Sequence, residues 1–239
     1  MRPEDRLFVA LDVDSPADAD RLLDRLIGTV TACKIGSQLF TAAGPAAVAH
    51  AHKRGFKVFL DLKFHDIPNT VAGAVREATR LGVFMLNMHA SGGSRMMRAA
   101  AEAAAAAARD FGVAKPLCLG VTVLTSLDRA DLQRDLGVAS SVEGHVLRLA
   151  EQARAAGLDG VVASPQEVRR LRLLIPRPWV LVTPGVRPAG AGTDDQARTA
   201  TPAAAIRAGA DYLVVGRPIT GAPDPAAAAR AILEEMAAA

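Results

Sequence analysis

The chain has 239 residues, of which half are hydrophobic and 22% are charged. This balance supplies a large apolar core and argues against intrinsic disorder. Lys and Arg exceed Asp and Glu by only 28 to 25, and aromatic residues make up 4% of the chain, so binding to nucleic acid is not expected. Two cysteines, Cys33 and Cys118, lie in separate apolar runs, which predicts buried free thiols in a reducing compartment.

The first residues do not read as a targeting or membrane segment. The stretch MRPEDRLFVALDVD contains acidic residues and enters a strand pattern almost at once, unlike a secretory leader. No apolar run approaches the roughly 20 residues that a bilayer requires. We therefore expect no membrane partner and a cytoplasmic location.

Eight short apolar runs recur along the chain, and each is followed by a longer amphipathic or alanine-rich stretch. The runs are residues 6–13, 30–36, 56–63, 83–89, 116–124, 159–164, 179–183 and 211–216. This alternation is typical of β/α units with a parallel sheet. About eight strands and eight helices in a chain this short, with no GxGxxG after the first run, favour a closed (β/α)₈ TIM barrel in a single domain, residues 1–239.

Three of the expected helices have clear sequence signals. Ser15-Pro16 and Ser164-Pro165 each place a capping serine before a proline that suits the first helical turn. The alanine-rich stretch after Ser94 favours a helix by propensity alone.

Charged residues are expected at the carboxyl ends of the strands, where barrels of this kind carry their active sites. The second run contains Lys34, and the third ends in Asp61-Leu62-Lys63. Alternation along a strand predicts that Asp61 and Lys63 share the inner face, with Leu62 outward. Charges facing inward must be paired, so a purely structural ion-pair network is the alternative to a catalytic one.

The last third carries a candidate phosphate site. Run seven leads into Thr183-Pro184-Gly185-Val186-Arg187, and run eight leads into Gly216-Arg217. Barrels often bind phosphate with these two loops, and paired arginines bind phosphate in a bidentate manner. Ordinary surface arginines that cap loop carbonyls are the alternative.

The segment DLKFHDIPNT, residues 61–70, resembles the signature D-x-K-x-x-D-I-x-x-T of the orotidine 5′-phosphate decarboxylase family. The segments LFVALDVD, CKIGSQLF, NMHASGG, LGVTVLTS, VTPGVRP and ADYLVVGRPI also resemble family segments, in the same order, from about residue 6 to 220. The resemblance implies decarboxylation of orotidine 5′-monophosphate to uridine 5′-monophosphate, with no cofactor and no metal.

The resemblance also implies roles for individual residues. Lys63 would protonate C6 of the pyrimidine, beside Asp61 and Lys34, while a partner subunit in a homodimer would supply Asp66, Ile67 and Thr70. Lys34, Asp61, Lys63 and the partner's Asp66 would form a neutral set of charges. The substrate-binding residues implied for the ribose, the ring edge and the phosphate side are Asp12, Lys34, Thr125, Pro184, Arg187, Gln196, Gly216 and Arg217.

Several alternatives stay open from the sequence. Thr125 could instead cap the helix that follows it, and His65 and His89 are left out of catalysis. One rival is a magnesium-dependent keto-sugar-phosphate decarboxylase or hexulose-phosphate synthase on the same barrel, which activity loss on chelation would favour. Another is a catalytically silent nucleotide-binding barrel.

Overall fold

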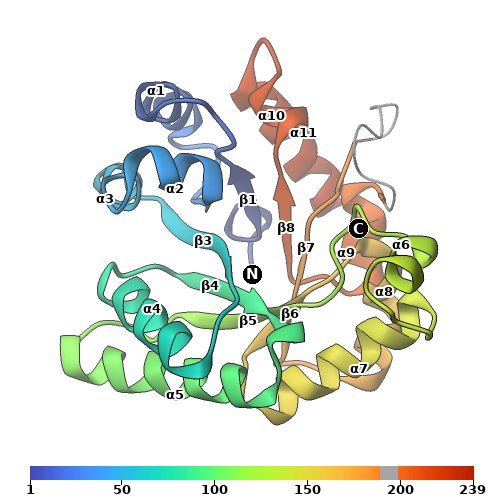
Figure 1. Ribbon diagram of the computed structural model, residues 1–239. Helices are drawn as coiled ribbons and strands as arrows, with labels where there is room; N and C mark the ends of the chain where they lie inside the picture. The colour runs from blue at the N-terminus through green and yellow to red at the C-terminus, as the bar shows by residue number, and fades with distance from the viewer. Residues whose placement is uncertain (189–198) are drawn as a thin grey trace.

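A computed structural model describes residues 1–188 and 199–239, in which eight parallel strands close into a barrel with helices around it (Figure 1). Neighbouring strands pair in chain order, and β8 pairs with β1. The strands are β1 (Leu7–Ala10), β2 (Ala32–Gly36), β3 (Lys57–Phe64), β4 (Met85–His89), β5 (Leu117–Val121), β6 (Gly160–Val162), β7 (Val180–Thr183) and β8 (Tyr212–Val215). Every predicted apolar run overlaps one of these strands, so the (β/α)₈ barrel is confirmed.

The described residues form eleven α-helices where about eight were expected, because two connections between strands and the segment after β8 hold two helices each. Gly44, with φ +59°, and Pro45 separate one such pair, α2 from α3. The helices are α1 (Pro16–Leu26), α2 (Ser37–Ala43), α3 (Ala46–Lys53), α4 (Pro68–Arg80), α5 (Ser94–Phe111), α6 (Arg129–Arg134), α7 (Val142–Ala155), α8 (Pro165–Leu174), α9 (Pro202–Ala208), α10 (Arg217–Thr220) and α11 (Pro225–Ala237), with 3₁₀ turns at Pro3–Asp5 and Ala90–Gly92. None of the described helices combines the length and apolarity needed to cross a bilayer.

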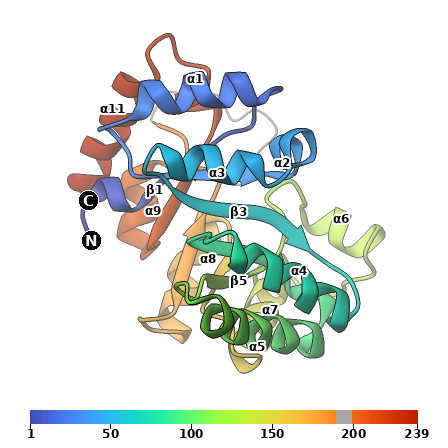
Figure 2. The same ribbon diagram turned by 90° about the vertical axis from the view of Figure 1, so that its left-hand side faces the viewer.

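The predicted helix starts are confirmed. Ser15 Oγ accepts a hydrogen bond from the backbone N–H of Asp18, and Ser164 Oγ accepts one from Gln166. The alanine-rich stretch forms α5, which ends at Gly112 in the left-handed conformation. Seen from the side, α6 lies apart from the helices that pack around the barrel (Figure 2).

The core has two parts, one on each side of the barrel wall. Outside, alternate strand residues pack against the helices and enclose both cysteines, and burial raises the pKa of each thiol to about 12. Inside, Phe8 packs edge-on against Phe59 and Tyr212, with ring centroids 6.1 and 5.6 Å apart. The inner cluster fills the amino-terminal part and the middle of the barrel, so its carboxyl end stays open to side chains of another kind.

We predict that Gly160→Ala destabilises the barrel. A Cβ atom at Gly160 would lie 2.2 Å from the backbone oxygen of Val180 on the adjacent strand, so one strand would have to shift. The expected loss in the free energy of unfolding is about 1–3 kcal/mol, measured by urea denaturation.

The matched control is Gly73→Ala in α4, where a Cβ meets nothing within 4 Å. Because alanine favours helix over glycine, this variant should gain about 0.5–1 kcal/mol. Equal effects of the two substitutions would contradict the argument.

Candidate active site

A cavity of about 690 Å³ opens at the carboxyl end of the barrel. Its apolar wall includes Phe59, Val121 and Val214. Most of the predicted site residues line it, namely Asp12, Lys34, Asp61, Lys63, Thr125, Pro184, Arg187, Gly216 and Arg217. The fold thus brings together residues that lie more than 200 positions apart in the chain.

A second hollow, of about 950 Å³, lies at the opposite end of the strands. Two of the cations that line it, Lys115 and Arg177, are paired with Asp159 and Asp211. The cavity at the carboxyl end, with charges gathered from several strands, is therefore the candidate active site.

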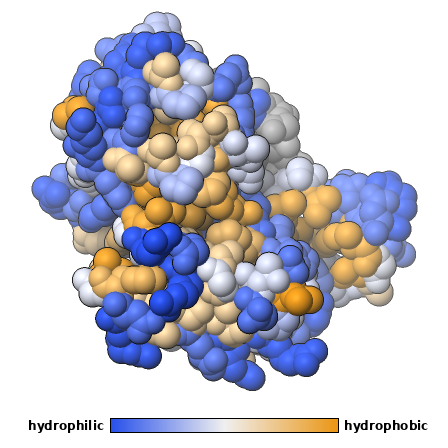
Figure 3. Space-filling model, turned by 60° about the vertical axis from the view of Figure 1, so that its left-hand side comes forward, coloured by the Kyte–Doolittle hydropathy of each residue, from blue (hydrophilic) through white to orange (hydrophobic). Residues whose placement is uncertain are grey.

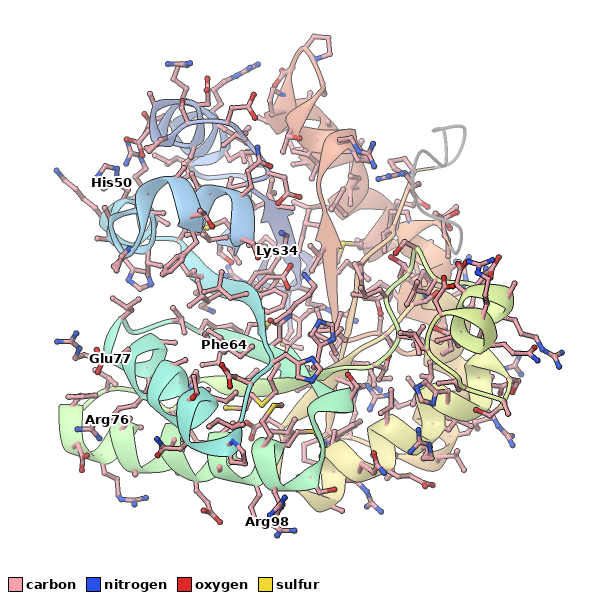
Figure 4. The ribbon with its side chains drawn as sticks, in the orientation of Figure 1. Lys34, His50, Phe64, Arg76, Glu77 and Arg98 are labelled. Atoms are coloured by element: carbon pink, nitrogen blue, oxygen red, sulfur yellow. The ribbon has the colours of Figure 1, made fainter. Side chains whose placement is uncertain are left out.

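Asp61 is the centre of the charged cluster in this cavity. Its Oδ1 accepts a hydrogen bond from Lys63 Nζ at 2.7 Å, and its Oδ2 lies 3.3 Å from Lys34 Nζ. Lys34 Nζ also donates to Asp12 Oδ1 at 2.9 Å. Figure 4 shows Lys34 in the middle of the ring of strands. The expected pairing of the inward charges is confirmed, and Asp12 joins it.

For Asp61 and Lys34, the two most buried members of the charged cluster, ion pairing shifts the pKa more than burial does. Burial alone would raise the pKa of Asp61, but the Lys34 and Lys63 charges, with hydrogen bonds from Lys63 and Asn87, hold that pKa below its ordinary value. Burial alone would lower the pKa of Lys34, but Asp61 and Asp12 hold it above its ordinary value. Both groups are therefore ionised at neutral pH.

Strand β3 reaches this arrangement through an irregular backbone. Leu60 pairs with Leu86, but Phe64 pairs with Met88, so three residues of β3 face one residue of β4. Lys63 has φ +52°, the single positive φ of any described residue other than glycine. Asp61 and Lys63 meet as predicted, yet regular alternation does not describe the strand between them.

Two residues of the site were missed from the sequence. Asn87, on β4, is fully buried and donates from Nδ2 to Asp61 Oδ1 at 2.7 Å. Gly36, at the end of β2, leaves room for the charges, since a Cβ there would lie 2.9 Å from Lys34 Nζ. A polar residue within the apolar run MLNMH was the available signal for Asn87, because a buried amide requires partners.

Arg187, Arg217 and Thr125 all line the cavity. Arg187 is 8% exposed and lines the cavity, which contradicts the surface alternative for this residue; Arg217 begins α10 and is exposed at the cavity rim. The helix after Thr125 is capped by Asp128 in a capping box with Asp131, so the capping alternative for Thr125 is wrong. Gln196 lies outside the described residues.

The residues expected to serve a partner subunit do not line this cavity. Asp66, Ile67 and Thr70 are all exposed, Ile67 by 66%. The carboxylate of Asp66 accepts a hydrogen bond from the backbone N–H of Ile67 at 2.6 Å. In their own protomer these residues lie between the end of β3 and the first turn of α4.

The two histidines near the site form a ring contact, with His65 and His89 centroids 5.4 Å apart. Burial, together with the nearby His65 and Lys63, holds the pKa of His89 below its ordinary value. Within residues 1–188 and 199–239, no group of three or more His, Cys, Asp or Glu side chains is arranged to hold a metal ion. Neither His65 nor His89 is among the residues that line the cavity.

Comparisons with known proteins agree on one family. The model of the orotidine 5′-phosphate decarboxylase / HUMPS family matches residues 5–232. The orotidine 5′-phosphate decarboxylase of Moorella thermoacetica is 55% identical over 99% of this chain and 94% of its own length, and that of Halorhodospira halophila is 56% identical over 98% and 97%. The crystal structure of orotidine 5′-phosphate decarboxylase from Lactobacillus acidophilus superposes with a TM-score of 0.85, at 38% identity, over 97% of this chain and 99% of that one.

We predict that Asp61→Asn lowers the free energy of unfolding by about 3 kcal/mol at pH 7, because it leaves the buried Lys34 ammonium and the half-buried Lys63 ammonium without their shared carboxylate. A carboxyl whose folded-state pKa is depressed stabilises the protein above its unfolded-state pKa. The difference from the parent should therefore shrink as pH falls below about 4 and vanish below the folded-state pKa. Urea denaturation across this pH range measures it.

Asp24→Asn is the matched control for this prediction. Asp24 is an exposed carboxylate paired with Arg54, and water screens such pairs. Its substitution should change stability far less. A difference between Asp61→Asn and the parent that is independent of pH would contradict the role of the Asp61 charge.

Proposed function

The chain belongs to the orotidine 5′-phosphate decarboxylase / HUMPS family, and on that premise we propose that it converts orotidine 5′-monophosphate to uridine 5′-monophosphate, the last step of de novo pyrimidine nucleotide synthesis, with Lys63 protonating C6. One observation carries the proposal. The Lys63 ammonium lies in the cavity, bound to Asp61 at 2.7 Å, and the same cavity is lined by Arg187 and Arg217.

The reaction requires a cation and a proton at one place. When the bond between C6 and the carboxylate breaks, CO₂ leaves and the electron pair stays on C6, which has no adjacent carbonyl to receive it. The Lys63 ammonium stabilises this charge and then donates its proton to C6, after which the amine is reprotonated from solvent. An arginine would stabilise the charge but would not give up a proton at neutral pH.

Asp61 serves two purposes in this proposal. It holds Lys63 through the 2.7 Å bond, and it presents a negative charge where the substrate carboxylate departs. The depressed pKa of Asp61 supports the second purpose, since the group is ionised throughout the neutral range. Lys34, shared between Asp61 and Asp12, balances the charge.

The rest of the nucleotide would lie along the cavity wall. Arg187 and Arg217 are suited to bidentate phosphate contacts, and Gly216 allows close approach of the backbone. Asp12 and Lys34 would bind ribose hydroxyl groups. Thr125 would contact the edge of the pyrimidine ring. Pro184 lines the same cavity, and Gln196 is proposed as a further phosphate ligand.

A homodimer completes the site in this proposal, with Asp66, Ile67 and Thr70 entering the cavity of the other protomer. In the space-filling view, hydrophobic residues gather across the middle of the side of the molecule on which β3 lies (Figure 3). Exposed hydrophobic patches of this kind often mark contact surfaces. The partner's Asp66 would give Lys63 a second carboxylate. Each lysine would then pair with two carboxylates, as Lys34 already pairs with Asp12 and Asp61.

The magnesium-dependent alternatives would need the same acids for the metal. In this structure Asp12 and Asp61 each carry a lysine ammonium, which competes with a metal ion for the same oxygens. That arrangement favours the decarboxylase that uses no metal.

We expect the protein to consume orotidine 5′-monophosphate in the presence of EDTA. The fall in substrate absorbance measures this consumption. Lys63→Ala should lower kcat by more than about 1,000-fold and still bind uridine 5′-monophosphate. Lys57→Ala, at the opposite end of the same strand, is the control and should keep full activity. Activity lost with EDTA would favour the magnesium-dependent alternative, and a Lys63→Ala variant with most of its turnover would contradict the role of Lys63.

Mixed dimers test the shared site. Lys63→Ala and Asp66→Asn should each be nearly inactive alone, yet their mixed dimer keeps one site with both native residues. Random exchange of subunits should restore about a quarter of the parent activity. Lys63→Ala mixed with Asp61→Asn should stay inactive, because both changes fall on the same protomer's side of the site. Equal activity of the two mixtures would contradict the dimer proposal.

A further inference from the structure

The irregular segment of β3 faces one residue of β4, and that residue is Asn87. Leu60 pairs with Leu86 and Phe64 with Met88, so Asn87 is the only residue of β4 between the two registers. Bulges of this kind next to active sites redirect a side chain, and they need their unpaired backbone groups satisfied from elsewhere.

Both polar atoms of the Asn87 carboxamide form hydrogen bonds with residues of the bulge. Its Oδ1 accepts a hydrogen bond from the backbone N–H of Lys63 at 2.8 Å, and its Nδ2 donates to Asp61 Oδ1 at 2.7 Å. The same Asp61 oxygen accepts from Lys63 Nζ at 2.7 Å. A closed ring of three hydrogen bonds therefore ties the Lys63 backbone, the Asp61 carboxylate and the Lys63 ammonium together.

The backbone of Lys63 needs such support. A φ of +52° is unfavourable for a lysine, and such conformations persist where the surroundings enforce them, commonly at functional sites. Asn87 is fully buried and is not among the residues that line the cavity. Its hydrogen bonds connect it to the cavity through Lys63 and Asp61.

We infer that Asn87 is a positioning residue that fixes the left-handed backbone of Lys63 and so aims its ammonium group at the reacting carbon. The inference rests on the proposed function, which it deepens. A positioning role differs from a purely structural one in its expected effect. Because the ring of bonds fixes Lys63, loss of Asn87 should lower turnover without weakening nucleotide binding.

Asn87→Leu tests the inference, since leucine has a similar volume and can make neither hydrogen bond. We expect kcat to fall about 100-fold, the cost typical of misplacing a reacting group, while the Kd for uridine 5′-monophosphate stays within about threefold. Thr79→Val is the control, because Thr79 is also fully buried but its hydroxyl donates to the backbone of Val75 within α4. It should keep the parent kcat.

Asn87→Asp keeps the test decisive if the leucine variant does not fold. Aspartate can accept from the Lys63 N–H, but only its protonated form can donate to Asp61, and one of two adjacent carboxyl groups holds its proton to higher pH. The ratio of its kcat to that of the parent should therefore rise as pH falls. The other ionisable side chains that face this position, Asp61, Lys63, Lys34, His65 and His89, are present in both proteins, so the pH dependence of the ratio reports the new carboxyl group and its coupling to Asp61.

The outcomes distinguish the inference from the proposed function. Hydrogen exchange of the Lys63 amide, compared between the parent and an Asn87 variant, does not depend on turnover, and it should quicken when the carboxamide is lost. A parent protein without decarboxylase activity overturns the proposed function alone. Unchanged kcat in Asn87→Leu, a flat kcat ratio in Asn87→Asp, or unchanged exchange at Lys63 overturns the inference.

Discussion

The Asp61 carboxylate lies inside the barrel between two lysine ammonium groups, and the rest of the site is arranged around it. Removing a charge from water costs several kcal/mol unless partners replace the solvent. Here the partners come from adjacent strands, since Gly36 of β2 pairs with Asp61 of β3 and Lys34 lies two residues earlier. The strand register that closes the barrel therefore also neutralises its charges, and a shift of register would disrupt both.

On the inner face of the barrel, apolar side chains give way to charged ones between two successive inward-facing positions of a strand. On β3, the buried ring of Phe59 precedes Asp61, and after β1, Ala10 precedes Asp12. The aromatic cluster at the amino-terminal end supplies rigidity and excludes water from below. The charges above it can then be held at low dielectric, where each interaction is stronger than in water.

Local patterns explain what could be predicted from the sequence. Apolar runs marked all eight strands, because such runs depend on neighbouring residues alone. Alternation predicted correctly that Asp61 and Lys63 meet, although the strand between them is bulged rather than regular. The bulge and Asn87 depend on how β4 pairs with β3, which no local pattern encodes. The same limit applies to Thr125, where Asp128 proved to be the helix cap. The role expected for Asp66 would need a second chain, so it stays a prediction.

In the proposed mechanism, the need for a fixed lysine follows from how charge interactions depend on distance. At an effective dielectric constant of about 20, moving an ammonium group from about 3 to about 4 Å from a developing negative charge weakens their attraction by about 1.4 kcal/mol. That loss alone slows the reaction about tenfold, before any cost to proton transfer. Lysine is long and flexible, so the side chain by itself would not hold such a position. A left-handed backbone braced by a buried amide restricts it from one end, while the bond to Asp61 restricts it from the other.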